Sequence, residues 1–173
     1  MVSTNQFREA MSQLSAAVNV ITTDGPLGRS GFTATAVCSV SDTPPTVLVC
    51  VYRGSRTAPV LKANGVLGVN VLNSSQDDVA ELFAGRGGVP MEDRFHRHAW
   101  CTSSNGLPIL ESALVSLVCT VTEIKELGTH DVVFARVDEV VRHPGCSAPL
   151  VYFDRVYGAV AQATRTLGEP DHV

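Results

Sequence analysis

Hydrophobic and polar residues alternate with the two-residue period of a β-strand over much of this 173-residue chain. Apolar side chains at alternate positions form one face of a strand, and clusters of Gly, Pro, Asn, Asp and Ser mark the turns between strands. These patterns predict strands over residues 18–23, 31–43, 46–52, 66–72, 114–124, 131–143 and 150–153. The segment 126–130 joins the two longest strands and therefore predicts a hairpin.

Helical spacing of apolar residues is confined to a few short segments. It predicts an amphipathic helix over Thr4–Ala17 and a second helix that begins within 54–59 and ends near Asn64 and Gly65. A third helix is predicted to start at Ser75 as its N-cap, with acidic residues in its first turn. Residues 85–106 predict a loop, and the chain from Ala161 onward predicts a frayed tail.

These elements together predict a mostly β fold, because strands and helices do not alternate regularly. An antiparallel barrel with a few short helices fits this order of elements. We expect one domain over residues 1–160 and a C-terminal tail over residues 161–173.

One predicted strand, GFTATAVCSVSDTPP over residues 31–45, is built almost entirely of small side chains. Strands that only fill a core favour Val, Ile, Leu and aromatic residues, because burial stabilises in proportion to apolar area. One interpretation is a half-buried strand whose Thr and Ser residues face solvent. The other is that a flat ligand fills the missing volume and that hydroxyl and backbone groups bond its polar edge.

The sequence Ser55-Arg56-Thr57 lies at the predicted start of the second helix. Hydroxyl groups, a guanidinium and free backbone N–H groups at a helix N-terminus form an anion site. The alternative is an ordinary capped helix with an exposed arginine. A flat-ring platform and a phosphate site on neighbouring elements are together more specific than either one alone.

Composition excludes several classes of function. The net charge of −4 offers no basic surface for nucleic acid. The first ten residues are untypical of a signal peptide, and the apolar runs are too short to span a bilayer, so no membrane association is expected. Five cysteines without Cys-x-x-Cys spacing argue against a disulfide framework or zinc ribbon and favour a reducing, cytoplasmic setting.

Several segments together resemble the short-chain flavin reductase family, the reductase components of two-component flavin-dependent monooxygenases. The resemblance runs from Phe7 to Tyr157, and the matching segments are 7–11, 17–25, 31–45, 70–73, 128–130 and 151–157. Many family members have Gly-Arg-Tyr where this chain has Asp154-Arg155-Val156-Tyr157.

The resemblance implies a split β-barrel of the Greek-key, FMN-binding type that acts as a homodimer, with flavin near the subunit interface. It also implies that NADH reduces FMN or FAD and that reduced flavin passes to a separate monooxygenase. The scarcity of Lys and Arg makes NADPH a less favoured donor. The resemblance also implies, by position, which residues contact the flavin ring, its ribityl chain and its phosphate. These are Phe32, Thr33, Ala34, Thr35, Ala36, Ser39, Cys50, Val51, Tyr52, Arg56 and Thr57. It implies that the nicotinamide is faced by His130, Arg155 and Tyr157, with His130 as the catalytic candidate.

Other interpretations of the same residues stay open at this point. His130 is also compatible with a turn residue bonded to the backbone, and Tyr157 with a core or interface aromatic. His96, His98 and Cys101 lack the spacing and carboxylates of a metal site, so no metal is expected. Two other functions remain: a reductase of the same fold acting on another acceptor such as a cobalt corrinoid, and a non-catalytic flavin-binding protein.

Overall fold

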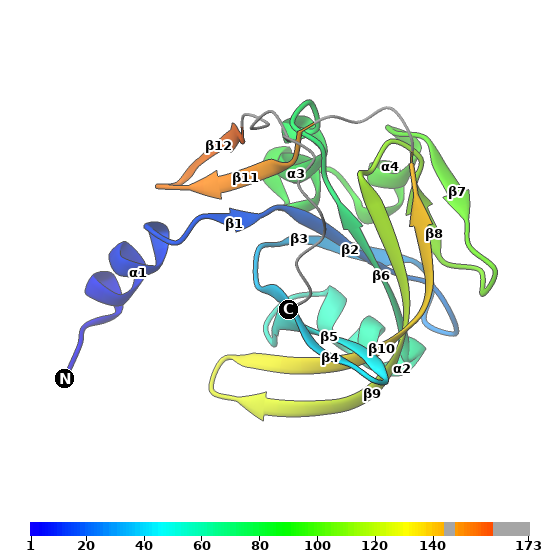
Figure 1. Ribbon diagram of the computed structural model, residues 1–173, viewed down its shortest axis with the longest axis horizontal. Coiled ribbons are helices and arrows are strands. Elements are labelled where there is room, and N and C mark those ends of the chain that lie inside the picture. The colour runs from blue at the N-terminus through cyan, green and yellow to red at the C-terminus, as the bar shows by residue number, and fades with distance from the viewer. Residues whose placement is uncertain (144–147, 161–173) are drawn as a thin grey trace, which may run out of the picture.

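A computed structural model describes residues 1–143 and 148–160 of the chain. The fold is mostly β, with a few short helices at its periphery (Figure 1). Its main sheet has seven strands in the order β3-β2-β6-β9-β10-β5-β4, and every neighbouring pair is antiparallel. The strands of this sheet are β2 (Asn19–Thr23), β3 (Ser30–Ala34), β4 (Val37–Asp42), β5 (Pro45–Tyr52), β6 (Val66–Val71), β9 (Val115–Leu127) and β10 (His130–Arg142).

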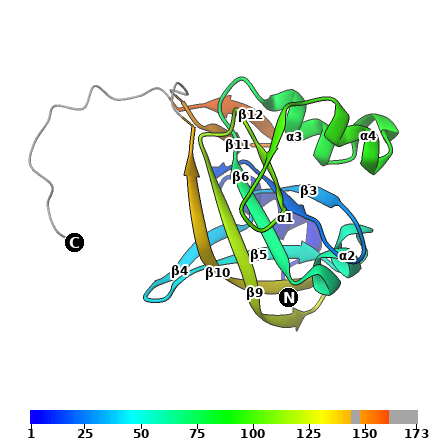
Figure 2. The same ribbon diagram turned by 90° about the vertical axis from the view of Figure 1, so that its right-hand side faces the viewer.

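The two edge strands of this sheet, β3 and β4, are consecutive in the chain. Only Thr35 and Ala36 separate them, so the sheet curves until its two edges approach at this link (Figure 2). Within the described residues β3 pairs only with β2, and β4 pairs only with β5, so strand pairing does not close the sheet. The strand predicted over 31–43 is therefore two strands, because Val37 N–H bonds to Thr35 O at 3.0 Å and turns the chain.

Two small sheets and several short helices complete the described part of the fold. A three-stranded sheet joins β1 (Ala16–Ala17), β11 (Leu150–Phe153) and β12 (Val156–Ala159), and a two-stranded sheet joins β7 (Trp100–Thr102) and β8 (Pro108–Leu110). The helices are α1 (Thr4–Ser12), α2 (Thr57–Asn64), α3 (Asp77–Phe83) and α4 (Met91–His96), with a 3₁₀ turn η1 (Arg86–Gly88).

The predictions for the first helix and for residues 85–106 were wrong in part. Helix α1 ends at Ser12 rather than Ala17, because Ala16 and Ala17 pair with β11. The predicted loop contains η1, α4 and β7, and α4 forms there because Phe95 is buried against Phe83 and Trp100.

The third helix begins one residue later than the sequence predicts. Gln76, not Ser75, is its N-cap, and the Ser75 hydroxyl bonds to the Asn73 side chain instead. The predicted hairpin is confirmed as β9 and β10, and the predicted tail, 161–173, lies outside the described residues.

Buried apolar residues from both ends of the chain hold the sheet together. One cluster includes Ile21 of β2, Leu67 of β6 and Val49 of β5, together with Leu61 of α2. Asn70 of β6 is also fully buried, and its amide bonds to Val20 O at 3.0 Å while its oxygen accepts bonds from Leu110 N–H and the Ser116 hydroxyl. Across the described residues, no helix is long and apolar enough to cross a membrane.

Candidate functional site

The small-residue stretch forms the two edges of the main sheet and the link between them. Thr35 and Ala36 in the link are exposed, and Ser39 on β4 is exposed as well. The preceding strand is anchored more firmly, because the Thr33 hydroxyl donates to Ala80 O of α3 at 2.6 Å and Ala34 is buried. Phe32 is half-buried and packs against the core. The exposed small residues therefore lie on a rigid support.

Strand β5 runs beside this link. Cys50 N–H donates to Ala36 O at 3.0 Å, so the two predicted flavin-binding segments lie side by side. The side chains alternate: Val51 points into the core, whereas Cys50 is half-buried and Tyr52 is 55% exposed. Burial, and secondarily the nearby Cys38 thiol, raises the pKa of Cys50. The Cys50 thiol is therefore a neutral group at neutral pH, suited to contact with an uncharged part of a ligand.

The predicted phosphate anchor lies at the start of α2. Arg56 is exposed and, within the described residues, its guanidinium makes neither an ion pair nor a capping bond. Ser55 accepts a bond from Ala58 N–H at 3.1 Å and so caps the helix. Thr57 is buried, and its hydroxyl lies 2.8 Å from the Ser30 hydroxyl and donates to Gly31 O at 3.3 Å. The Thr57 side chain thus fixes α2 to β3, whereas the charge of Arg56 is not paired with a carboxylate among the described residues.

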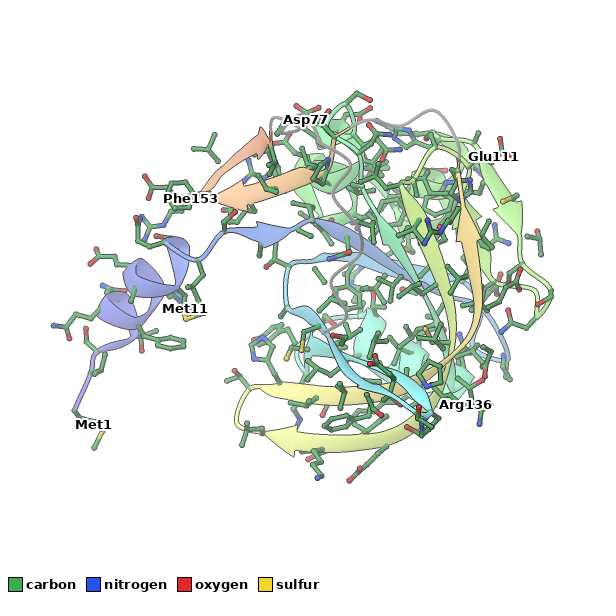
Figure 3. The ribbon with its side chains drawn as sticks, viewed as in Figure 1. Met1, Met11, Asp77, Glu111, Arg136 and Phe153 are labelled. Atoms are coloured by element: carbon green, nitrogen blue, oxygen red, sulfur yellow. The ribbon has the colours of Figure 1, made fainter. Side chains whose placement is uncertain are left out.

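A cavity of about 680 Å³ lies between α1 and the body of the protein. Thr35, Ala36 and Arg155 line it together, which joins two predicted flavin residues to one predicted nicotinamide residue. Arg8, Tyr152 and the apolar side chains of α1 complete the wall. Met11, one of these, lies on the side of α1 that faces the sheet (Figure 3).

The β11–β12 hairpin positions Arg155 and Tyr157. Asp154 and Arg155 form its turn with φ values of 47° and 65°, in the left-handed region that two-residue hairpin turns require. The end of α1 holds this turn, because Asp154 N–H bonds to Ser12 O at 2.7 Å and Gln13 donates to the Asp154 carboxylate at 3.0 Å. Tyr157 contacts Tyr152 with ring centres 5.3 Å apart, but it does not line the cavity.

His130 lies at the start of β10, and neither His130 nor Tyr157 lines the cavity that Arg155 lines. It is exposed and pairs across the sheet with Tyr52, with ring centres 5.6 Å apart. Its Nδ1 lies 2.9 Å from the Thr129 hydroxyl. The structure therefore places His130 beside Tyr52, at the end of β5.

Sequence reasoning missed two residues of this region. Arg8 of α1 lines the same cavity as Arg155, and Asp131 next to His130 is almost fully buried. The charge of Asp131 in an alternating strand was the available signal, because a carboxylate on an inward-facing position needs a partner.

Comparison with known proteins identifies the family. A model of the flavin reductase like domain matches residues 11–161. The chain is 49% identical over 154 residues to the FMN reductase (NADH) RutF of Enterobacter cloacae. The aligned region covers 89% of this chain and 92% of that protein. It is also 49% identical over 160 residues to RutF of Escherichia coli O139:H28, covering 92% and 96% of the two chains.

Solved structures agree with this assignment. A putative flavin reductase from Haemophilus somnus superposes with a TM-score of 0.87 at 41% identity, over 92% of this chain and all of the other. BorF, the flavin reductase component of a bacterial two-component tryptophan halogenase, superposes with a TM-score of 0.85 at 28% identity, over 93% and 100% of the chains. By its sequence and its fold alike, this chain belongs to the flavin reductase family.

Proposed function

We propose that this flavin reductase transfers a hydride from NADH to FMN or FAD and supplies the reduced flavin to a partner monooxygenase. The relatives named FMN reductase (NADH) support NADH and FMN as substrates. Structural neighbours named as reductase components of a tryptophan halogenase and of styrene monooxygenase support a separate flavin-consuming partner. FAD is included because another neighbour is named an NADH:FAD oxidoreductase.

The observation that carries this proposal is the exposed link between the two edge strands. Thr35 and Ala36 leave room that larger side chains would fill, and they line the 680 Å³ cavity. Arg56, without a carboxylate partner in the described part of the chain, lies at the helix start that follows β5. A planar ring with an anionic tail matches this arrangement of small residues and one free guanidinium.

The architecture proposed for this site is a split β-barrel of the Greek-key, FMN-binding type. Its support is the strand order, in which β3 and β4 form opposite edges of one curved sheet and meet at residues 35–36. The proposed domain spans residues 1–160. The split between the two edges is the proposed position of the flavin ring.

The proposed roles follow the positions of the residues. Small side chains and backbone groups of 32–36 lie along the ring, Ser39 and residues 50–52 along the ribityl chain, and Arg56 with Thr57 at the phosphate. Because the Thr57 hydroxyl is bonded internally, its proposed contribution is to hold α2 in place and to present backbone N–H. His130, Arg155 and Tyr157 are proposed to face the nicotinamide.

Flavin, when bound, supplies the hydride acceptor at N5. The protein's part is to hold the two rings together. This lowers the barrier by avoiding an orientational entropy cost of at most about 7–11 kcal/mol. Backbone N–H groups along β3 and the link are proposed to stabilise negative charge on the ring edge. No side-chain nucleophile is needed for this reaction.

We further propose that the protein acts as a homodimer in the cytoplasm. The exposed apolar face of α1 supports the homodimer, and the odd number of cysteines without Cys-x-x-Cys spacing supports a reducing compartment.

Steady-state kinetics with each pair of nicotinamide and flavin test the proposal. We expect NADH oxidation to depend on added flavin, to be faster with NADH than with NADPH, and to proceed with FMN. NADH oxidation that is independent of added flavin, in a protein that stays yellow through gel filtration, would instead indicate a bound prosthetic group and another acceptor. A purified protein that binds FMN without oxidising NADH would contradict the reductase assignment.

A further inference from the structure

A buried carboxylate next to His130 has no role in the function proposed above. Asp131 is the second residue of β10, and its side chain is 1% exposed. Removing a carboxylate from water costs several kcal/mol unless cations compensate its charge. The partners of Asp131 therefore indicate what the residue holds in place.

Two cations and a second carboxylate surround Asp131. Lys62 Nζ of α2 lies 2.9 Å from one Asp131 oxygen, and Arg53 Nε lies 3.6 Å from the other. Glu126, near the end of β9, bridges both cations at 2.8 Å from Arg53 and 3.3 Å from Lys62. Contact with Asp131 is the largest of the influences that raise the pKa of Lys62, so its ammonium stays charged. The four charges cancel, and they join three elements: the end of β5, α2 and the β9–β10 hairpin.

Arg53 connects this cluster to the turn that carries His130. Its backbone N–H bonds to Thr129 O at 3.0 Å, and its guanidinium donates to Gly128 O at 3.3 Å. Thr129 in turn bonds the His130 ring. Arg53 thus contacts residues on both sides of His130, and only Gly54 and Ser55 separate it from the predicted phosphate anchor.

The cluster also borders open space. Arg53, Ser55, Lys62 and Asp131 line a cavity of about 480 Å³ next to the start of α2. The cluster therefore forms part of an open wall beside Ser55, the residue that precedes Arg56.

We propose that Asp131 and Arg53 are positioning residues that fix the His130 imidazole relative to the flavin site. This inference rests on the proposed function. Neither residue touches the reacting atoms: Asp131 orients the Arg53 guanidinium, and Arg53 holds the 128–130 turn against the end of β5. Displacement of a reacting group by about 1 Å can lower a rate by roughly 100-fold, so loss of either residue acts mainly on kcat.

The test uses Arg53→Gln and Asp131→Asn in the full chain, with FMN affinity measured by flavin titration and kcat and KM measured with NADH. We expect kcat to fall by roughly tenfold or more, with FMN affinity within about threefold of wild type. Asp138→Asn is the matched control, because it removes a carboxylate paired at 2.7 Å with Arg136 on the same strand, and it should leave kcat unchanged. Asp131→Asn risks unfolding, but the Arg53 side chain is 43% exposed, so Arg53→Gln carries the test by itself if necessary.

A double-mutant cycle with His130→Ala separates positioning from a merely structural role. If Arg53 and Asp131 act through His130, Arg53→Gln should lower kcat no further in the His130→Ala background. Wild-type kcat in Arg53→Gln, a multiplied loss in the double variant, or wild-type kinetics in His130→Ala would each overturn the inference. If the wild-type protein itself fails to oxidise NADH with flavin, the proposed function fails and the inference with it, a result already visible before any variant is made.

Discussion

Ala36 provides the most direct residue-scale test of the flavin site. Its side chain is exposed and lines the cavity, while its carbonyl oxygen bonds to Cys50 N–H, a bond that any L-residue retains. We expect Ala36→Leu to fold normally and to lose flavin-stimulated NADH oxidation by roughly 5- to 150-fold, since the added carbons occupy the space proposed for the ring (about 1–3 kcal/mol for such overpacking). Ala63→Leu, at an exposed position on α2, is the control. Normal activity in Ala36→Leu would place the flavin elsewhere.

Arg56 tests the phosphate end of the same site. A hydrogen bond to a charged group contributes about 1.5–3 kcal/mol, so Arg56→Ala should weaken FMN binding by roughly 10- to 100-fold. Riboflavin, which lacks the phosphate, should bind both proteins about equally. Arg136→Ala removes the same charge from β10 and should change neither affinity. Equal losses for FMN and riboflavin would remove Arg56 from the phosphate role; both ligands are measured by flavin fluorescence titration.

Strands whose side chains alternate between core and surface could be predicted from the sequence. β5 and β10 follow the alternation closely, because each has one face against the same apolar core, whereas β6 has four consecutive buried residues. The elements that were missed depend on distant partners: β1 exists because β11 pairs with it, and α4 because Phe95 packs on Phe83. Single-sequence patterns contain no information about such partners.

The same limit applies to the candidate site. The small residues at 33–36 were visible in the sequence because they break the composition of a core strand. The sequence could not reveal that the Thr57 hydroxyl is already bonded to β3, or that Asp131 has two cations beside it. Both facts require α2 to be placed against the sheet, which is a property of the fold.

Asn70 is the element-scale test of how β6 is held. Its buried amide joins β2, β8 and β9, since its bonds reach Val20, Leu110 and Ser116. Asn70→Ala leaves the Leu110 N–H and the Val20 carbonyl with one partner fewer, at about 1–3 kcal/mol for each buried group. We expect the free energy of unfolding in urea to fall by about 3 kcal/mol. Asn5→Ala on exposed α1 is the control, and a loss below about 1 kcal/mol for Asn70→Ala would show that the network contributes little.

At the scale of the whole molecule, α1 leaves its apolar side chains exposed. Figure 1 shows α1 extending away from the sheets. The helix has nine residues and buries none of them, and its Phe7 and Met11 are 58% and 45% exposed, as is Leu14 just after it at 59%. Isolated helices shorter than about 12–15 residues are marginal in water, so this one needs a surface to pack against. In the proposed homodimer the second copy of the chain provides that surface.

The homodimer has a definite consequence for mass and activity. Light scattering should give twice the chain mass of 18.4 kDa for the wild-type protein and the single chain mass for the double variant Phe7→Asp, Met11→Asp. Two carboxylates would replace the apolar side chains proposed to pack against the second copy, and the cost of removing them from water opposes association. Asn5→Asp, which adds charge to the same helix outside the cavity lining, should remain dimeric. Because α1 and Arg155 line the same cavity as Thr35 and Ala36, the dissociated variant should also lose NADH oxidation. A wild-type protein that is monomeric and fully active would contradict both expectations, and the flavin site would then have to be complete within one chain.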